Sequence, residues 1–71
     1  MRVINQNNTA IMECDMIKIA GKEIFGFFFG DSKHVTIGTY NTEEEAKSAF
    51  SLCKHMASNK SSKVIDLSLI K

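Results

Sequence analysis

Alternation of hydrophobic and polar positions in the first forty residues predicts short β-strands joined by tight turns. Within the second segment the alternation changes phase, because Ile17 shares a face with Glu13 and Asp15, so we expect a bulge or bend near residues 13–16. Short connections favour antiparallel neighbours, which predicts a meander. The predicted strands cover residues 2–6, 9–20, 23–29 and 34–39.

After Tyr40 the hydrophobic spacing changes from two to 3.6, which predicts a helix from Thr42 to about Ser58. Thr42 is the expected N-cap and Glu45 stands three positions later, as in a capping box. Glu43 and Glu44, which stand between these two residues, also lie in the first turn, where the helix dipole favours negative charge. The apolar stripe expected to pack on the sheet consists of Ala46, Ala49, Phe50, Cys53, Met56 and Ala57.

The end of the chain also alternates. Residues 60–62 read as a short linker after the helix, and Val64–Ile70 is predicted to be a last strand or an extended tail. The sequence contains no repeat and no internal boundary, so residues 1–71 form one domain. We therefore predict an α+β fold, a small, mainly antiparallel β-meander with one amphipathic helix packed on it and a C-terminal β-like segment.

The strand at residues 23–29 is apolar on both faces. Alternation places Phe25, Phe27 and Phe29 on one face and Ile24 with Phe28 on the other. One helix covers only one face of a sheet, and the second face of an antiparallel sheet is normally polar. The run therefore predicts more apolar surface than the helix buries.

Two interpretations of this surplus stay open. In the first, Ile24 and Phe28, joined by Ile65 and Leu67 from the tail, contact a partner protein or a second copy of the chain. In the second, the C-terminal segment or a curled sheet buries them within one chain. A chain of 71 residues has a thin core, which self-association often completes, so we expect a homo-oligomer, with a dimer as the first candidate.

A different function class would use the same aromatic residues to stack nucleobases. Phe27 and Phe29, together with Phe28, are the candidates for such a single-stranded nucleic-acid-binding module. The net charge of +1 provides no general attraction for nucleic acid. Nearby lysines are offset by Glu23 and Asp31, so we expect a protein partner instead.

No enzyme, metal or cofactor is expected. Cys53 lies late in the predicted helix, where the dipole disfavours a thiolate nucleophile, and His55, two residues on, points to another face. No phosphate-binding or catalytic motif is present. Without a signal peptide or a membrane span, we expect a cytoplasmic protein with Cys14 and Cys53 as reduced thiols.

Two short motifs add a resemblance. The chain opens with the pattern M-x-x-I-N-Q and carries G-x-Y-x-T-E-E-x-A at the strand-to-helix junction. These motifs resemble small uncharacterised proteins of phages and prophages of Gram-positive bacteria, although residues 12–15 depart from that pattern and a proline-containing C-terminus is lacking. The matching residues are Met1, Ile4, Asn5 and Gln6, then Gly38, Tyr40, Thr42, Glu43, Glu44 and Ala46.

The resemblance implies a phage-borne accessory protein that acts in the host cytoplasm by binding. Our prediction from the sequence is a non-enzymatic binding or regulatory protein that engages a host protein, with inhibition of a host defence as one such role. The alternatives are the nucleic-acid-binding module described above and an oligomer that sequesters a small molecule.

Overall fold

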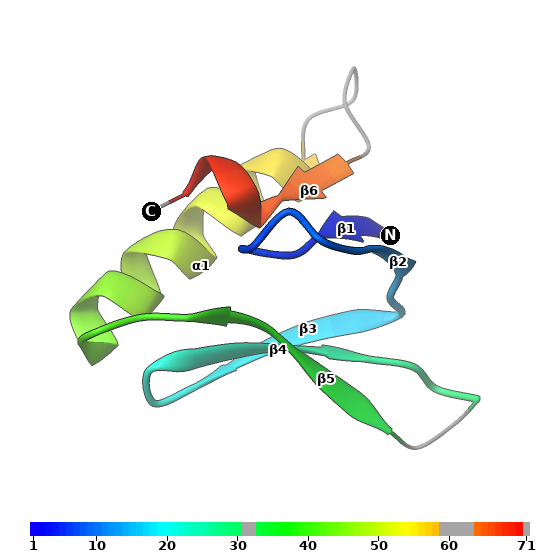
Figure 1. Ribbon diagram of the computed structural model, residues 1–71, viewed down its shortest axis with the longest axis horizontal. Coiled ribbons are helices and arrows are strands. Elements are labelled where there is room, and N and C mark those ends of the chain that lie inside the picture. Colours follow the sequence, from blue (N-terminus) through cyan, green and yellow to red (C-terminus); the bar gives the residue numbers. More distant parts are fainter. Residues whose placement is uncertain (31–32, 59–63, 71) are drawn as a thin grey trace.

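The computed structural model describes residues 1–30, 33–58 and 64–70. It confirms an α+β fold in which six short strands and one long helix make up most of the described chain (Figure 1). The elements are β1 (Arg2–Ile4), β2 (Ile11–Glu13), β3 (Met16–Ala20), β4 (Glu23–Phe27), β5 (His34–Thr39), α1 (Glu43–Ser58), β6 (Val64–Asp66) and the 3-10 helix η1 (Leu67–Leu69).

The strands form two sheets of three. The meander β3-β4-β5 is antiparallel throughout, and the second sheet has the order β2-β1-β6. In that second sheet β1 pairs antiparallel with β2 and parallel with β6. The prediction of mainly antiparallel pairing is confirmed, and the predicted break near residues 13–16 is the point where the chain passes from one sheet to the other.

The helix begins as its sequence predicts. The Thr42 hydroxyl accepts a hydrogen bond from the Glu45 N–H at 3.1 Å, and the Glu45 carboxylate accepts from the Asn41 N–H at 3.2 Å. These contacts satisfy amide groups that the first turn leaves without helical partners. Of the predicted stripe, Ala57 is exposed, whereas the other members are buried or partly buried.

The C-terminal segment is shorter as a strand than its alternation suggests. β6 ends at Asp66, whose side chain accepts a hydrogen bond from the Ser68 N–H at 3.0 Å and so caps η1. The predicted strand at residues 23–29 likewise ends at Phe27. The predicted linker at residues 60–62 lies outside the described residues.

The core lies between the meander and a layer made of α1, β1, β6 and η1 (Figure 1). Gly26 of β4 faces this core, and a Cβ atom there would stand 2.7 Å from the Cys14 Sγ. Such an approach is closer than carbon and sulfur tolerate, so only glycine fits without a shift. The side of the meander that faces the core, which we call its inner face, is therefore closed by a tight steric fit.

Candidate functional site

The structure buries the residues that the sequence proposed as a binding surface. Ile24, Ile65 and Leu67 are at most 1% exposed, and Phe28 is partly buried against the same core. The hypothesis that Ile24, Ile65 and Leu67 form a free surface is wrong, because the three side chains lie in one buried core cluster and α1 packs against β4. The second interpretation, burial within one chain, is confirmed for Ile24.

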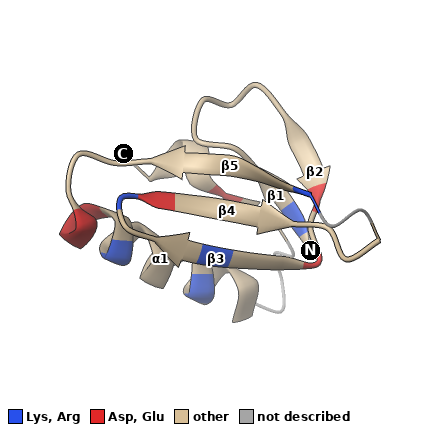
Figure 2. Ribbon diagram, turned by 90° about the horizontal axis from the view of Figure 1, so that it is seen from below, with Lys and Arg blue, Asp and Glu red and all other residues tan. Residues whose placement is uncertain are grey.

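The opposite side of the meander is open. We call the side of β3-β4-β5 that points away from α1 the outer face, and Figure 2 shows it with no described element in front of it. Cross-strand pairing arranges its side chains in three rows. These rows are Met16, Phe27 and His34; Lys18, Phe25 and Thr36; and Ala20, Glu23 and Thr39.

Three rings form a cluster on the outer face. The His34 ring is 5.2 Å from the Phe25 ring, edge to face at 88°, and 5.2 Å from the Phe27 ring, stacked at 27°. Both phenylalanines are only partly buried. Aromatic pairs at these separations are favourable beyond their buried area, so these contacts stabilise the arrangement of the three rings.

Lys18 completes this arrangement on the other side of Phe27. Its Nζ lies 5.6 Å from the centre of the Phe27 ring. Because β3 and β5 flank β4, Lys18 and His34 approach Phe27 from opposite sides. Both faces of the Phe27 ring are therefore occupied.

The acidic side chain and the basic side chain of the outer face, Glu23 and Lys18, do not form an ion pair with each other. Glu23 accepts a hydrogen bond from the Thr36 hydroxyl at 3.4 Å, whereas Lys18 extends toward Phe27. Within residues 1–30, 33–58 and 64–70, the only ion pairs involve Glu13. The outer face thus presents one positive and one negative group beside an aromatic cluster.

Phe29 stands beyond the end of β4 and is 71% exposed. Its backbone N–H donates to the Asp15 carboxylate at 2.9 Å, which fixes the main chain beneath it. Of the two residues proposed for base stacking, Phe27 lies in the cluster with its ring faces covered. The other, Phe29, is exposed to solvent.

The thiols are placed in the core. Cys14 and Cys53 are free cysteines that are at most 1% exposed. Burial raises the pKa of Cys53 to about 11 and also raises the pKa of Cys14. A protonated, buried thiol is a poor nucleophile, so this chemistry does not suggest a cysteine enzyme. In the described part of the chain, no three His, Cys, Asp or Glu side chains group closely enough to hold a metal ion.

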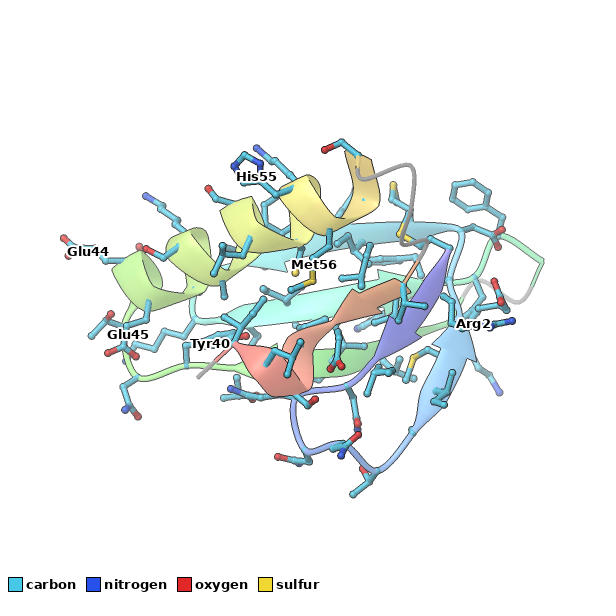
Figure 3. All side chains as sticks on the ribbon, turned by 90° about the horizontal axis from the view of Figure 1, so that it is seen from above. Arg2, Tyr40, Glu44, Glu45, His55 and Met56 are labelled. Atoms are coloured by element: carbon cyan, nitrogen blue, oxygen red, sulfur yellow. The ribbon has the colours of Figure 1, made fainter. Side chains whose placement is uncertain are left out.

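Two of the surface grooves lie elsewhere on the described part of the chain. One of about 290 Å³ is lined by Met1, Arg2, Glu13 and Val64. The other, of about 510 Å³, runs beside the first turns of α1, where Figure 3 shows Glu44 and Glu45 projecting from the helix. Glu45 is committed to the helix cap, and the hydroxyl of Tyr40, which also lines this groove, is buried without a hydrogen-bond partner.

Burial raises the pKa of Tyr40, and the proximity of the Cys53 thiol raises it further. The Tyr40 phenol therefore stays protonated, and a protonated phenol is a weak base. No carboxylate accepts a hydrogen bond from its hydroxyl. Neither groove joins a nucleophile to a base, so the outer face is the stronger candidate site.

Comparison of the chain with protein families, curated proteins and solved structures gives no match. α1 lacks the length and apolar content that a helix needs to cross a membrane, as does every helix in the described ranges.

The sequence contained a signal for the outer face that our prediction did not use. Glu23 has the same parity in β4 as Phe25 and Phe27, and a charged residue marks the solvent side of a half-buried strand. Gly26 shares the parity of Ile24, which marks the side of close packing. Met16, Lys18 and His34 come to lie beside Phe25 and Phe27 only through the register between strands. The alternation within a single strand does not specify that register.

Proposed function

We propose that this chain is a non-enzymatic binding protein and that its outer face is a protein-binding surface. The observation that carries the proposal is the ordered cluster of Phe25, Phe27 and His34 on a sheet face that no other described element covers. Aromatic side chains fixed before binding are typical anchors of protein interfaces, since little conformational entropy remains to be lost.

The same geometry favours a protein over a single-stranded nucleic acid. A nucleobase stacks on a free ring face, but His34 and Lys18 occupy the two faces of Phe27. Binding a base there requires displacing one of them. A net charge of +1 also supplies little attraction for phosphates.

The proposal extends to a phage-borne protein that acts on a host protein in the bacterial cytoplasm, with inhibition of a host defence as one such role. Its support is the resemblance at the M-x-x-I-N-Q start and the strand-to-helix junction. Two free cysteines are typical of a chain that works in a reducing compartment, which fits the cytoplasm.

The test compares three forms of the immobilised protein: the wild type, Phe27→Asp on the outer face, and Leu69→Asp on η1. Leu69 is 75% exposed and so provides a matched control for replacing an apolar surface residue with a charge. We expect proteins retained from a bacterial lysate by the wild type to be retained by L69D and lost by F27D. Equal retention by F27D would refute the proposal, as would salt-sensitive oligonucleotide binding that F27D abolishes.

A further inference from the structure

We propose that the free edge of β3 binds an acidic, extended peptide segment of a partner protein as an added β-strand. The site consists of the outward backbone groups of Ile17 and Ile19 together with three side chains of α1, those of Lys47, Phe50 and Lys54. We call it the edge strip. It lies beside the outer face, uses other groups and goes beyond the proposed function.

The backbone of β3 is unpaired on one side. A two-residue turn joins β3 to β4, so Ala20 and Glu23, which flank this turn, form a hydrogen-bonded pair. Bonding alternates along an antiparallel pair, which turns the N–H and C=O groups of Ile17 and Ile19 away from β4. β3 is the first strand in its sheet, and in the described ranges no backbone hydrogen bond from another segment reaches these groups.

The opposite edge of the same meander is closed by the chain itself. The Ile37 carbonyl of β5 accepts a hydrogen bond from the Gln6 N–H at 2.8 Å, and the Thr39 N–H donates to the Gln6 side chain at 2.8 Å. A lysine often guards an open edge, but the Lys18 amine lies over Phe27 on the outer face. The edge of β3 is therefore open to an added strand, which would satisfy its backbone groups.

α1 presents a distinct side to this edge. Met56 marks the side of the helix that faces β6, because its sulfur accepts a hydrogen bond from the Asp66 N–H at 3.3 Å. Helical spacing places Lys47, Phe50 and Lys54 together on the other side of the buried stripe. Figure 2 shows the two basic segments of α1 below β3, on the side of its free edge.

The edge strip combines apolar and positively charged groups. Ile17, Ile19 and Phe50 are only partly buried against the core, so an added strand gains apolar contacts there. The Lys54 Nζ lies 5.3 Å from the centre of the Phe50 ring, and Lys47 is exposed. Neither lysine forms an ion pair with another described residue. Carboxylates on the added strand supply the missing negative charge.

A second copy of the chain is a less favourable occupant. Antiparallel pairing of two β3 edges about a twofold axis keeps both α1 helices on the same side of the joined sheet. Lys47 and Lys54 of the two copies then face each other across the junction, and like charges oppose association. Charge therefore favours an acidic partner over self-pairing.

The experiment is an NMR titration of the nitrogen-15-labelled full chain with a short synthetic peptide in which valine and glutamate alternate. We expect saturable binding below about 1 mM peptide. At saturation the amide exchange of Ile17 and Ile19 should slow about tenfold, because these N–H groups gain partners, whereas that of Lys18, already bonded to β4, should not change. The counterpart peptide with lysine in place of glutamate should bind at least about tenfold more weakly.

Lys54→Glu should weaken binding of the glutamate peptide about fivefold or more. Lys33→Glu, an exposed charge reversal outside the edge strip, is the matched control and should leave it unchanged. Far-UV circular dichroism checks that both variants are folded, and the comparison of the two peptides on the wild type needs no variant.

Three results overturn the proposal: no binding of the glutamate peptide at about 1 mM, equal binding of the two peptides, or binding that leaves the Ile17 and Ile19 amides unprotected. A single-stranded oligonucleotide that displaces the peptide and depends on Lys54 also overturns it, since the lysines would then serve phosphates. The proposed function has a separate readout, the lysate comparison of F27D with L69D, which alters no group of the edge strip.

Discussion

The two faces of the β3-β4-β5 meander are built from the same strands and differ in what lies over them. On the inner face, Ile24 is completely buried and Gly26 lets Cys14 approach the backbone. On the outer face, Phe25 and Phe27 carry larger apolar side chains and remain partly exposed. The amount of apolar surface does not decide which face is covered.

What separates the faces is steric fit and charge. The inner face lacks charged side chains and includes a glycine position that a Cβ would fill. The outer face carries Lys18 and Glu23, whose burial without partners would cost several kcal/mol. A face that mixes aromatic rings with unpaired charges suits a partner that brings complementary charges of its own.

The largest expected effect comes from truncating neighbouring residues of β4 that point to opposite faces. Ile24→Ala should lower the free energy of unfolding by about 3 kcal/mol, because it leaves a cavity in a filled core. Phe25→Ala should cost about 1 kcal/mol, chiefly the contact with His34, although it removes the larger side chain. Urea denaturation of dilute protein measures both, and equal losses would contradict the distinction between the faces.

A smaller effect tests the close approach on the inner face. Gly26→Ala should destabilise the fold by about 2 kcal/mol, because the new methyl group meets the Cys14 sulfur. In a Cys14→Ala background the same change should cost clearly less. Gly30→Ala is the matched control, since a Cβ there has no atom within 4 Å. Additive losses in this double-mutant cycle would show that the sulfur is not the obstacle.

Next in size is a loss of folding stability at alkaline pH, which comes from a thiol buried in the core. The Cys53 thiol ionises near its ordinary pKa of 9.0 in the unfolded chain but only near about 11 in the folded one. Stability is therefore fully present below pH 9 and falls as the pH rises toward 11, by about 1 kcal/mol at pH 10. Cys53→Ala should flatten this slope in urea denaturation across that range, and an unchanged slope would contradict the assignment.

The smallest expected effect concerns the outer face alone. Lys18→Ala should change the stability of the monomer by less than about 0.5 kcal/mol, because its amine lies over Phe27 in contact with water. Lys54→Ala on α1 provides a matched comparison, with its Nζ 5.3 Å from the centre of the Phe50 ring. A loss above about 1.5 kcal/mol for Lys18 alone would mean that this face contributes to folding.

Local signals in the sequence were enough for the helix and for the turn chemistry. Thr42 and Glu45 predicted the start of α1 because capping is a contact between residues three positions apart. The turn at residues 7–8 likewise contains Asn8 at a positive φ of 57°, a conformation that asparagine tolerates.

Contacts between distant residues were not predictable in this way. β1 pairs in parallel with β6, more than fifty residues away, and no local pattern specifies that partner. The register shift between Ile24 and Phe25 places both Ile37 and Gly38 of β5 on the buried side, which strict alternation excludes. The candidate site was missed for the same reason, since His34 and Lys18 join Phe27 only through register.

The sequence by itself determined that β4 has two apolar sides, that a capped helix follows the meander, and that the domain is of the α+β class. These properties depend on periods of two and 3.6 and on contacts within one turn. Glu23 and Gly26 mark which side of β4 is buried, but only the tertiary structure decided what covers that side. That choice depends on where α1, β6 and η1 pack, because the cover that closes one face comes from parts of the chain remote in sequence.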